Sequence, residues 1–309
     1  IYAEAAEVAG NTVSGNMVAA PGTYNDGYGG GLYASSSTVT GNQVVDNVVS
    51  AYSDARGGGV YVTGSTAAGN EVTGNECTSR IAYGGGLYAN ASAVSGNTVS
   101  DNLSTASGSN VLGGGIYATS TSNLSDNVVS GNVSTADDYV YGGGVRQSDG
   151  NFTGNTVVGN SSLATKKEVQ GGGVWFDSEG AFTGNTVADN VSTSIAVDQP
   201  IYGAGVYLIG NGLFEENGIV RNEADTNLAF VYGAGAYLSS AAEANCNTVT
   251  NNVLENSDHA GGIYVPDGKD LAFNGSNLFG NDGYDPVSYT HLTLPTRSWQ
   301  CRSRWGPGR

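Results

Sequence analysis

The amino-acid sequence predicts an all-β chain folded as a parallel β-helix of about ten coils, each 27–32 residues long. Three observations support this prediction. A glycine triplet recurs with that period, a pair of asparagines five residues apart recurs with it, and helical periodicity is absent from a chain rich in Gly, Asn, Ser and Thr. Ten stacked coils would make a rod on the order of 48 Å long. A propeller blade needs about 40 to 50 residues, so the unit is too short for that alternative.

The recurring glycine triplet is predicted to have a structural role and not to bind a ligand. It begins as Gly29-Gly30-Gly31, and in later units it becomes Gly203-Ala204-Gly205 and Gly233-Ala234-Gly235. A glycine loop that cradles phosphate occurs once per domain, where a strand leads into a helix. Nine copies with no predicted helix between them exclude such a nucleotide site and indicate a sharp corner where coils approach closely.

The asparagine pairs are the strictest part of the unit, and an apolar residue lies three positions before most of them. Asparagine tolerates left-handed backbone, so we expect these residues at turns. Stacked at the same turn of successive coils, their amides can hydrogen-bond along the rod as a ladder. The first predicted ladder is Asn42, Asn70, Asn97, Asn127, Asn155, Asn185, Asn217 and Asn247. The second is Asn47, Asn75, Asn102, Asn132, Asn160, Asn190, Asn222 and Asn252.

Short strands are expected after each triplet. In Leu32-Tyr33-Ala34 the first and third side chains should face inward and the second outward. The predicted inward column is Leu32, Val60, Leu87, Ile116, Val145, Val174, Val206, Ala236 and Ile263. Such a column would bury a narrow, continuous core.

An aromatic column should face outward beside that core. It comprises Tyr33, Tyr61, Tyr88, Tyr117, Trp175, Tyr207, Tyr237 and Tyr264, with Arg146 in the register of the missing ring. Rings one coil apart can stack and shield the strand face, which is a structural interpretation. An exposed aromatic stripe can also be a contact surface, which is a functional one.

One pair of loops is a candidate ligand-binding site. Aligned by the glycines that follow them, Tyr24 lies over Tyr52 and Asp26 over Asp54, with Arg56 at the rim. Two carboxylates one coil apart repel unless a cation or Arg56 lies between them. The tyrosines could hold sugar rings, and the aspartates could hold Ca²⁺. The alternative is two exposed turns whose aspartates face water.

Composition limits the partners. The chain carries 28 acidic and 11 basic residues, a net charge of −17, which argues against nucleic acid and suits an extracellular protein. Cys77 and Cys246 lie about six coils apart and cannot pair with each other along a rod. No segment is long and apolar enough to span a membrane, so a membrane link would need an anchor or barrel outside this sequence.

The repeat resembles the polymorphic outer membrane proteins of chlamydiae and related autotransporter passengers. Those carry GGA[IL] and FxxN motifs, which are similar to the GGG units here and to Phe152-Thr153-Gly154-Asn155 and Phe182-Thr183-Gly184-Asn185. The resemblance covers residues 1 to about 285. It implies a right-handed β-helix on the outer surface of a bacterial cell or secreted from it, often acting as an adhesin.

The expected function is adhesin-like binding of a glycan or a host-surface protein through variable loops, of which residues 17–28 and 191–202 are the longest. One alternative is a polysaccharide lyase or hydrolase whose catalytic coils lie outside this sequence. Another is a phage tail fibre. The sequence shows no Ser/His/Asp set or metal-ligand cluster, and no cofactor other than Ca²⁺ is suggested.

Two regions are expected. Residues 1–286 hold the repeats and look truncated at both ends. Residues 287–309 look like a non-native tail, because "VSYTHLTLPT" reads without a gap as a translated sequencing adapter. Four of the basic residues and none of the acids fall in this tail, so the repeats alone carry 28 acids against 7 Lys and Arg.

Overall fold

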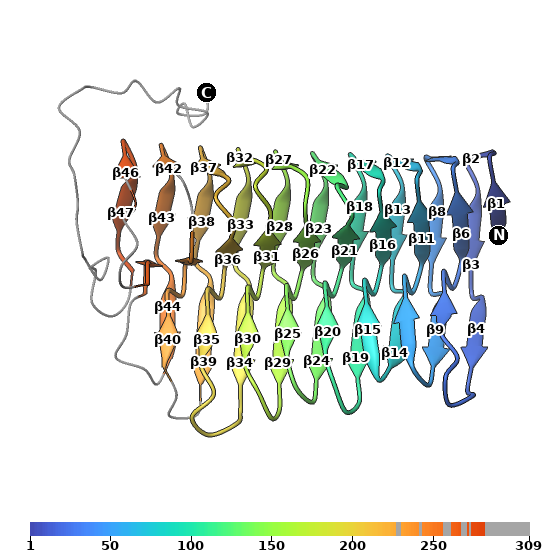
Figure 1. The fold of residues 1–309 in the computed structure, drawn as a ribbon, viewed down its shortest axis with the longest axis horizontal. Coiled ribbons are helices and arrows are strands. Elements are labelled where there is room, and N and C mark those ends of the chain that lie inside the picture. Colours follow the sequence, from blue (N-terminus) through green and yellow to red (C-terminus); the bar gives the residue numbers. More distant parts are fainter. Residues whose placement is uncertain (227–229, 241–242, 256–260, 267–270, 272, 282–309) are drawn as a thin grey trace.

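A computed structural model describes residues 1–226, 230–240, 243–255, 261–266, 271 and 273–281. Over these residues the chain is a parallel β-solenoid without helices, built of about nine coils side by side (Figure 1). Strands β45 (Ile263–Tyr264), β46 (Phe273–Asn274) and β47 (Asn277–Phe279) extend three of its sheets beyond them. The all-β, parallel solenoid fold is confirmed. The predicted tail, residues 287–309, lies outside the described residues.

Each coil adds one strand to each of five parallel sheets. In the fourth coil these strands are β16 (Leu87–Asn90), β17 (Ala93–Ser95), β18 (Thr98–Ser100), β19 (Leu103–Ala106) and β20 (Val111–Leu112). The sheets that contain them are named A to E in that order. Within the described residues sheets A, B and C have ten strands each, sheet D has nine and sheet E has eight. No helix here could cross a membrane.

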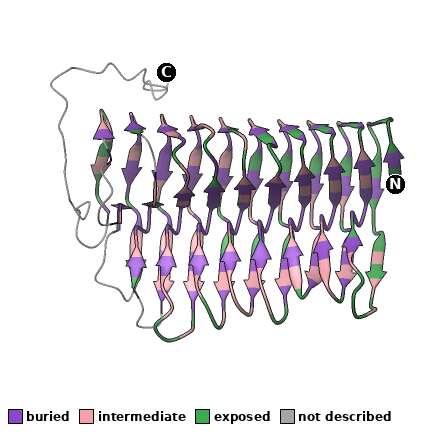
Figure 2. Cartoon of the chain, in the orientation of Figure 1, coloured by how far each residue is buried: buried purple, intermediate pink, exposed green. Residues whose placement is uncertain are grey.

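The cross-section holds two hydrophobic cores. Side chains of sheets A, B and C form the larger one, which includes Leu87, Val94 and Val99. Sheets D and E enclose a smaller one, which includes Cys77 as a free thiol and Val111. The inward column after the triplets, from Leu32 to Ile263, is buried throughout. Figure 2 shows these buried residues continuing from coil to coil.

The glycine triplet separates the two cores. In the third coil, a Cβ atom at Gly59 would lie 2.8 Å from Asn75 Cγ and 2.9 Å from Val72 Cγ1. At Gly58 it would lie 2.6 Å from the Glu76 carbonyl oxygen, which belongs to the start of β14 (Glu76–Ser79) in sheet D. The triplet therefore packs directly on the second asparagine turn, and this close approach leaves no space for larger side chains. The solenoid is pinched at this line.

Both sets of asparagines form buried, hydrogen-bonded ladders. Asn97 shows the pattern, because its backbone N–H and its Nδ2 each donate to Asn127 Oδ1 of the next coil, both at 3.0 Å. Its Nδ2 also donates to the Ala67 carbonyl of the previous coil at 2.9 Å. Ala67 lies three residues before Asn70. The apolar residue three positions before an asparagine thus supplies both a core side chain and the carbonyl that the next coil's asparagine binds.

The left-handed backbone expected at the asparagines lies one residue earlier. Asp46 (φ 53°), Gly96 (φ 61°), Asp126 (φ 55°) and Asn251 (φ 56°) each precede a ladder asparagine. Among the described residues, no asparagine of the two predicted ladders has positive φ. Gly, Asp and Asn accept this conformation most readily, so the residue before the ladder turns the chain. The asparagine after it binds the polar groups of the turn.

Candidate ligand-binding site

The outward residues of sheet A form one column along the rod. Tyr33, Tyr61, Tyr88 and Tyr117 are opposite one another in register, and Arg146, Trp175, Tyr207, Tyr237 and Tyr264 continue the row. Ring centroids lie 4.9 Å apart for Tyr33 and Tyr61 and 4.7 Å apart for Tyr61 and Tyr88, with interplanar angles of 7°. Rings one coil apart therefore stack along the column.

A second aromatic column, which sequence reasoning missed, runs beside the first. It consists of residues that end the strands of sheet E, immediately before the triplets: Tyr28, Tyr83, Tyr141, Tyr202 and Tyr232. Arg56 occupies the same position between Tyr28 and Tyr83. The signal was present in the sequence, since tyrosine recurs directly before the first glycine of the triplet in five units.

The two columns meet edge to face. Tyr28 contacts Tyr61 with centroids 5.3 Å apart at 88°, and Tyr202 contacts Tyr237 at 5.2 Å and 84°. Both columns point away from the cores, yet their rings touch. The outer surface must therefore be concave between sheets A and E, where the glycines pinch the solenoid. We call this surface, made of both columns with Arg56 and Arg146, the aromatic corner.

Several tyrosines of the aromatic corner are partly buried, and burial raises their pKa. Burial raises the pKa of Tyr141 and Tyr202 to about 12, and it raises the pKa of Tyr88 and Tyr207 still further. The hydroxyl groups of most of these tyrosines have no partner among the described residues and are not enclosed. They reach solvent as neutral donors and acceptors, one for nearly every coil.

Arg146 replaces a ring in the first column. Its guanidinium carbon lies 5.2 Å from the ring centroid of Tyr117, 4.3 Å from that of Trp175 and 5.8 Å from that of Tyr141. A planar guanidinium stacks on aromatic faces, so it continues the column as a charged layer.

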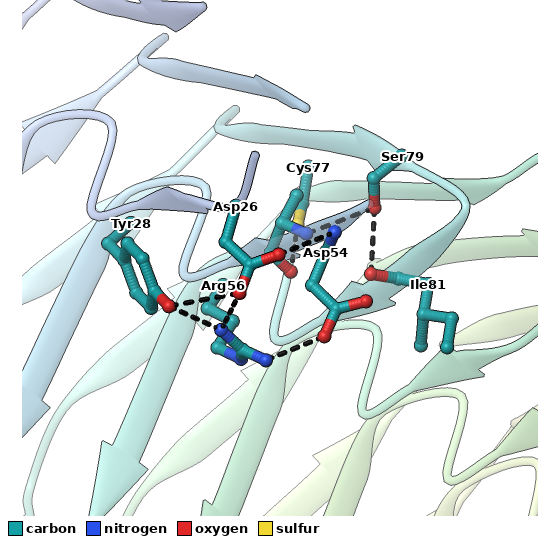
Figure 3. A network of polar contacts seen from close by, with 8 residues as sticks. Asp26, Tyr28, Asp54, Arg56, Cys77, Ser79 and Ile81 are labelled. Atoms are coloured by element: carbon teal, nitrogen blue, oxygen red, sulfur yellow. Dashed lines mark hydrogen bonds and ion pairs between the residues drawn. The ribbon is translucent and has the colours of Figure 1, made fainter. Parts of the chain in front are cut away.

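Arg56 joins the two predicted aspartates at one end of the aromatic corner (Figure 3). Its Nη1 donates to Asp26 Oδ2 at 2.9 Å, and its Nη2 donates to Asp54 Oδ2 at 2.6 Å. Nη1 also donates to the Tyr28 hydroxyl at 2.7 Å, and that hydroxyl donates to Asp26 at 3.1 Å. The two carboxylates were expected to need either a bound cation or Arg56 between them, and in the structure Arg56 lies between them.

The pKa values of Asp26 and Asp54 are shifted in opposite directions. Burial alone would raise the pKa of Asp26, but hydrogen bonds from Arg56 and Tyr28 outweigh it and hold that pKa below its ordinary value. Burial raises the pKa of Asp54, and attraction to Arg56 offsets this only in part. The pKa of Arg56 is raised, because its bonds to the aspartates outweigh the effect of burial. Asp54 is the more enclosed of the two carboxylates, with a side-chain exposure of 17% against 28% for Asp26.

Tyr24 and Tyr52 do not join this cluster. The Tyr52 N–H donates to the Ala20 carbonyl at 2.9 Å, so Tyr52 continues the register of the preceding strands and is not aligned with Tyr24. Tyr24 is 91% exposed, and the described residues include no ring contact to it. The predicted stacking of Tyr24 over Tyr52 is wrong because the two loops differ in length.

The described residues hold no group of three or more His, Cys, Asp or Glu side chains that could bind a metal ion. Between Asp26 and Asp54, the guanidinium of Arg56 takes the position where Ca²⁺ was considered. Because Ca²⁺ needs six to eight oxygen ligands, this cluster does not fit it.

Comparison of the chain with protein-family models, with curated proteins and with solved structures found no match.

Proposed function

We propose that this chain is an extracellular or surface-displayed binding scaffold of adhesin type, which holds a linear glycan along the aromatic corner. The observation that carries the proposal is the row of stacked, partly buried tyrosines, in which the hydroxyls of Tyr61, Tyr88, Tyr207 and Tyr237 reach solvent and have no partner among the described residues. Tyrosines with a buried ring and a wet hydroxyl are typical of binding surfaces. The repeated glycine triplet and the Phe-x-x-Asn segments, which resemble those of surface-displayed passengers, support the same reading.

The repeat of the rod favours a polymeric ligand. Successive coils present equivalent groups about 4.8 Å apart, and a solenoid offers an extended concave surface. A linear polysaccharide also repeats along its length and carries a hydroxyl-bearing ring in every unit. Sugar hydroxyls would exchange hydrogen bonds with the phenols, while the ring edges provide apolar contact.

The two longest variable loops connect to this surface. Residues 17–28 end on Tyr28 and residues 191–202 end on Tyr202, both of which belong to the aromatic corner. Loops on a rigid scaffold commonly select the ligand. We infer that these loops border the bound glycan and that the aromatic corner supplies the shared contact.

The test is a binding survey of immobilised linear polysaccharides, followed by calorimetric titration of those that bind. The informative variant is Tyr207→Phe/Tyr237→Phe, which keeps both stacked rings and removes two hydroxyls. We expect weaker binding at unchanged thermal stability. Tyr24→Phe is the matched control, since Tyr24 lies outside the aromatic corner. The proposal fails if no polysaccharide binds, or if the double variant binds as the parent does.

A further inference from the structure

Arg146 is an unpaired cation in a strongly acidic protein. The described residues contain four ion-pair contacts, which pair Arg56, Lys166 and Arg221 with aspartates. Arg146 takes part in none of them and makes no hydrogen bond. The Nε of Arg146 is buried without a partner, whereas its other guanidinium nitrogens are not enclosed.

Stacking does not use the donors of Arg146. Tyr117 and Trp175 precede and follow Arg146 in the column, and its guanidinium carbon lies over both rings, whereas the N–H groups of a guanidinium lie in its plane and point to its edge. An unpaired, partly buried donor is unfavourable, and a ligand oxygen would relieve that cost. The aromatic layers also hold the plane in one orientation, which prepares it for a two-pronged contact with an oxyanion.

Arg56 and Arg146 each replace a ring in one of the two columns, Arg56 in the sheet E column and Arg146 in the sheet A column, but their charged neighbours differ. Both arginines lie in the aromatic corner, and both lie over tyrosine rings. Arg56 is neutralised by Asp26 and Asp54, whereas Arg146 has no such partners. Asp177 is an acidic residue whose charge interacts with that of Arg146. Burial raises the pKa of Asp177 and attraction to Arg146 lowers it, but the two side chains form no ion pair.

We propose that Arg146, held between Tyr117 and Trp175, is an anion subsite of the aromatic corner, which binds the carboxylate or sulfate group of an acidic glycan. This inference rests on the proposed glycan-binding function and adds the class of ligand. Neutral sugar units would contact the tyrosines on either side, while one acidic unit is anchored by two N–H···O bonds.

The test compares hyaluronan oligosaccharides with their carboxyl-reduced counterparts, which keep the chain and lose the charge. A heparin oligosaccharide distinguishes a sulfate from a carboxylate requirement. Affinities are measured for the parent chain, Arg146→Gln and Asp177→Asn, and thermal melting verifies that each variant is folded. We expect Arg146→Gln to weaken binding of the acidic glycan roughly tenfold or more and to leave the neutral form unaffected. Asp177→Asn should bind the acidic glycan more tightly, because it removes a competing negative charge.

Each outcome decides between the two proposals. Equal affinity of the parent chain for acidic and neutral forms, or no change in Arg146→Gln and Asp177→Asn, overturns the anion subsite and leaves glycan binding in place. If the parent chain binds none of the three glycans, the inference fails together with the proposed function for these ligands. If Arg146→Gln weakens binding of the heparin oligosaccharide and leaves the affinity for hyaluronan unchanged, the subsite is assigned to sulfate.

Discussion

The side-chain amide of Asn102 donates to the side-chain oxygen of Asn132, 2.9 Å away in the next coil, and both residues are buried. Asn102 also accepts two bonds from Asn75, at 2.9 Å and 3.0 Å, and donates to the Val72 carbonyl at 3.0 Å. One side chain therefore links three successive coils, because it bonds to groups in the coil before it and in the coil after it. Since buried groups left without partners are costly, the ladders should be a main source of stability.

Replacement of Asn102 by alanine should lower the free energy of unfolding by about 3 kcal/mol, because it leaves the Asn75 N–H and the Val72 carbonyl unpaired. Urea denaturation followed by circular dichroism measures this. Asn11→Ala is the matched control, since Asn11 is exposed. This substitution should lower the free energy of unfolding by less than about 1 kcal/mol. Equal losses in the two variants would contradict the role of the buried ladder.

Gly86→Ala should be strongly destabilising, by about 2 kcal/mol or more, because its Cβ would lie 2.6 Å from Val99 Cγ1 and 2.8 Å from Asn102 Nδ2. Gly96→Asn should be tolerated within about 1 kcal/mol. Gly96 has no atom near its Cβ position, and Asn251 adopts the same left-handed backbone, with φ 56°, before the second ladder. The shift in thermal midpoint measures both. A larger shift for Gly96→Asn would show that the triplet is not the close-packed line.

Asp26→Asn should lower stability by about 1 kcal/mol near neutral pH, because it removes the charged acceptor of Arg56. The pKa of Asp26 is lowered in the fold, so its contribution is present above the unfolded-state pKa and is lost as pH falls through the lower value. The difference from the parent chain should begin to shrink below about pH 4 and disappear once the pH is below the lowered pKa of Asp26. The pKa of Asp54 is raised, so ionised Asp54 opposes folding, and Asp54→Asn should cost less.

Urea midpoints at about pH 7 and about pH 3 check the aspartate prediction. Added Ca²⁺ should leave the midpoint of the parent chain unchanged. A Ca²⁺-dependent increase that Asp26→Asn/Asp54→Asn abolishes would show that a metal, and not Arg56, balances the two carboxylates.

Tyr88→Ala should cost about 2 kcal/mol, because its ring lies 4.7 Å from that of Tyr61 and 5.1 Å from that of Tyr117. Tyr88→Phe should be nearly neutral, since the hydroxyl has no protein partner. Tyr24→Ala, at an exposed loop, is the control for loss of a tyrosine. If Tyr88→Ala costs no more than Tyr24→Ala, the column is a binding surface without a structural role.

Several parts of the site could be read from the sequence because they repeat. Tyr88 and Arg146 were placed in one column by counting from the triplet, which works wherever the register between coils is unchanged. Asp26 and Asp54 were paired in the same way, and Arg56 was one of two candidate counter-charges. Tyr24 was misplaced because counting fails inside loops of unequal length.

The stacked coil follows from the sequence alone. The fixed spacing of glycine and asparagine allows only a stacked, parallel arrangement, since each buried amide needs its equivalent one coil away. The division of each coil into two cores becomes visible only in three dimensions, because it depends on how closely the triplet packs on Asn75 and Val72. The pinch folds two outward rows toward each other. Tyr28 thereby meets Tyr61, and Arg146 lies between Tyr117 and Trp175, contacts that linear spacing could not specify.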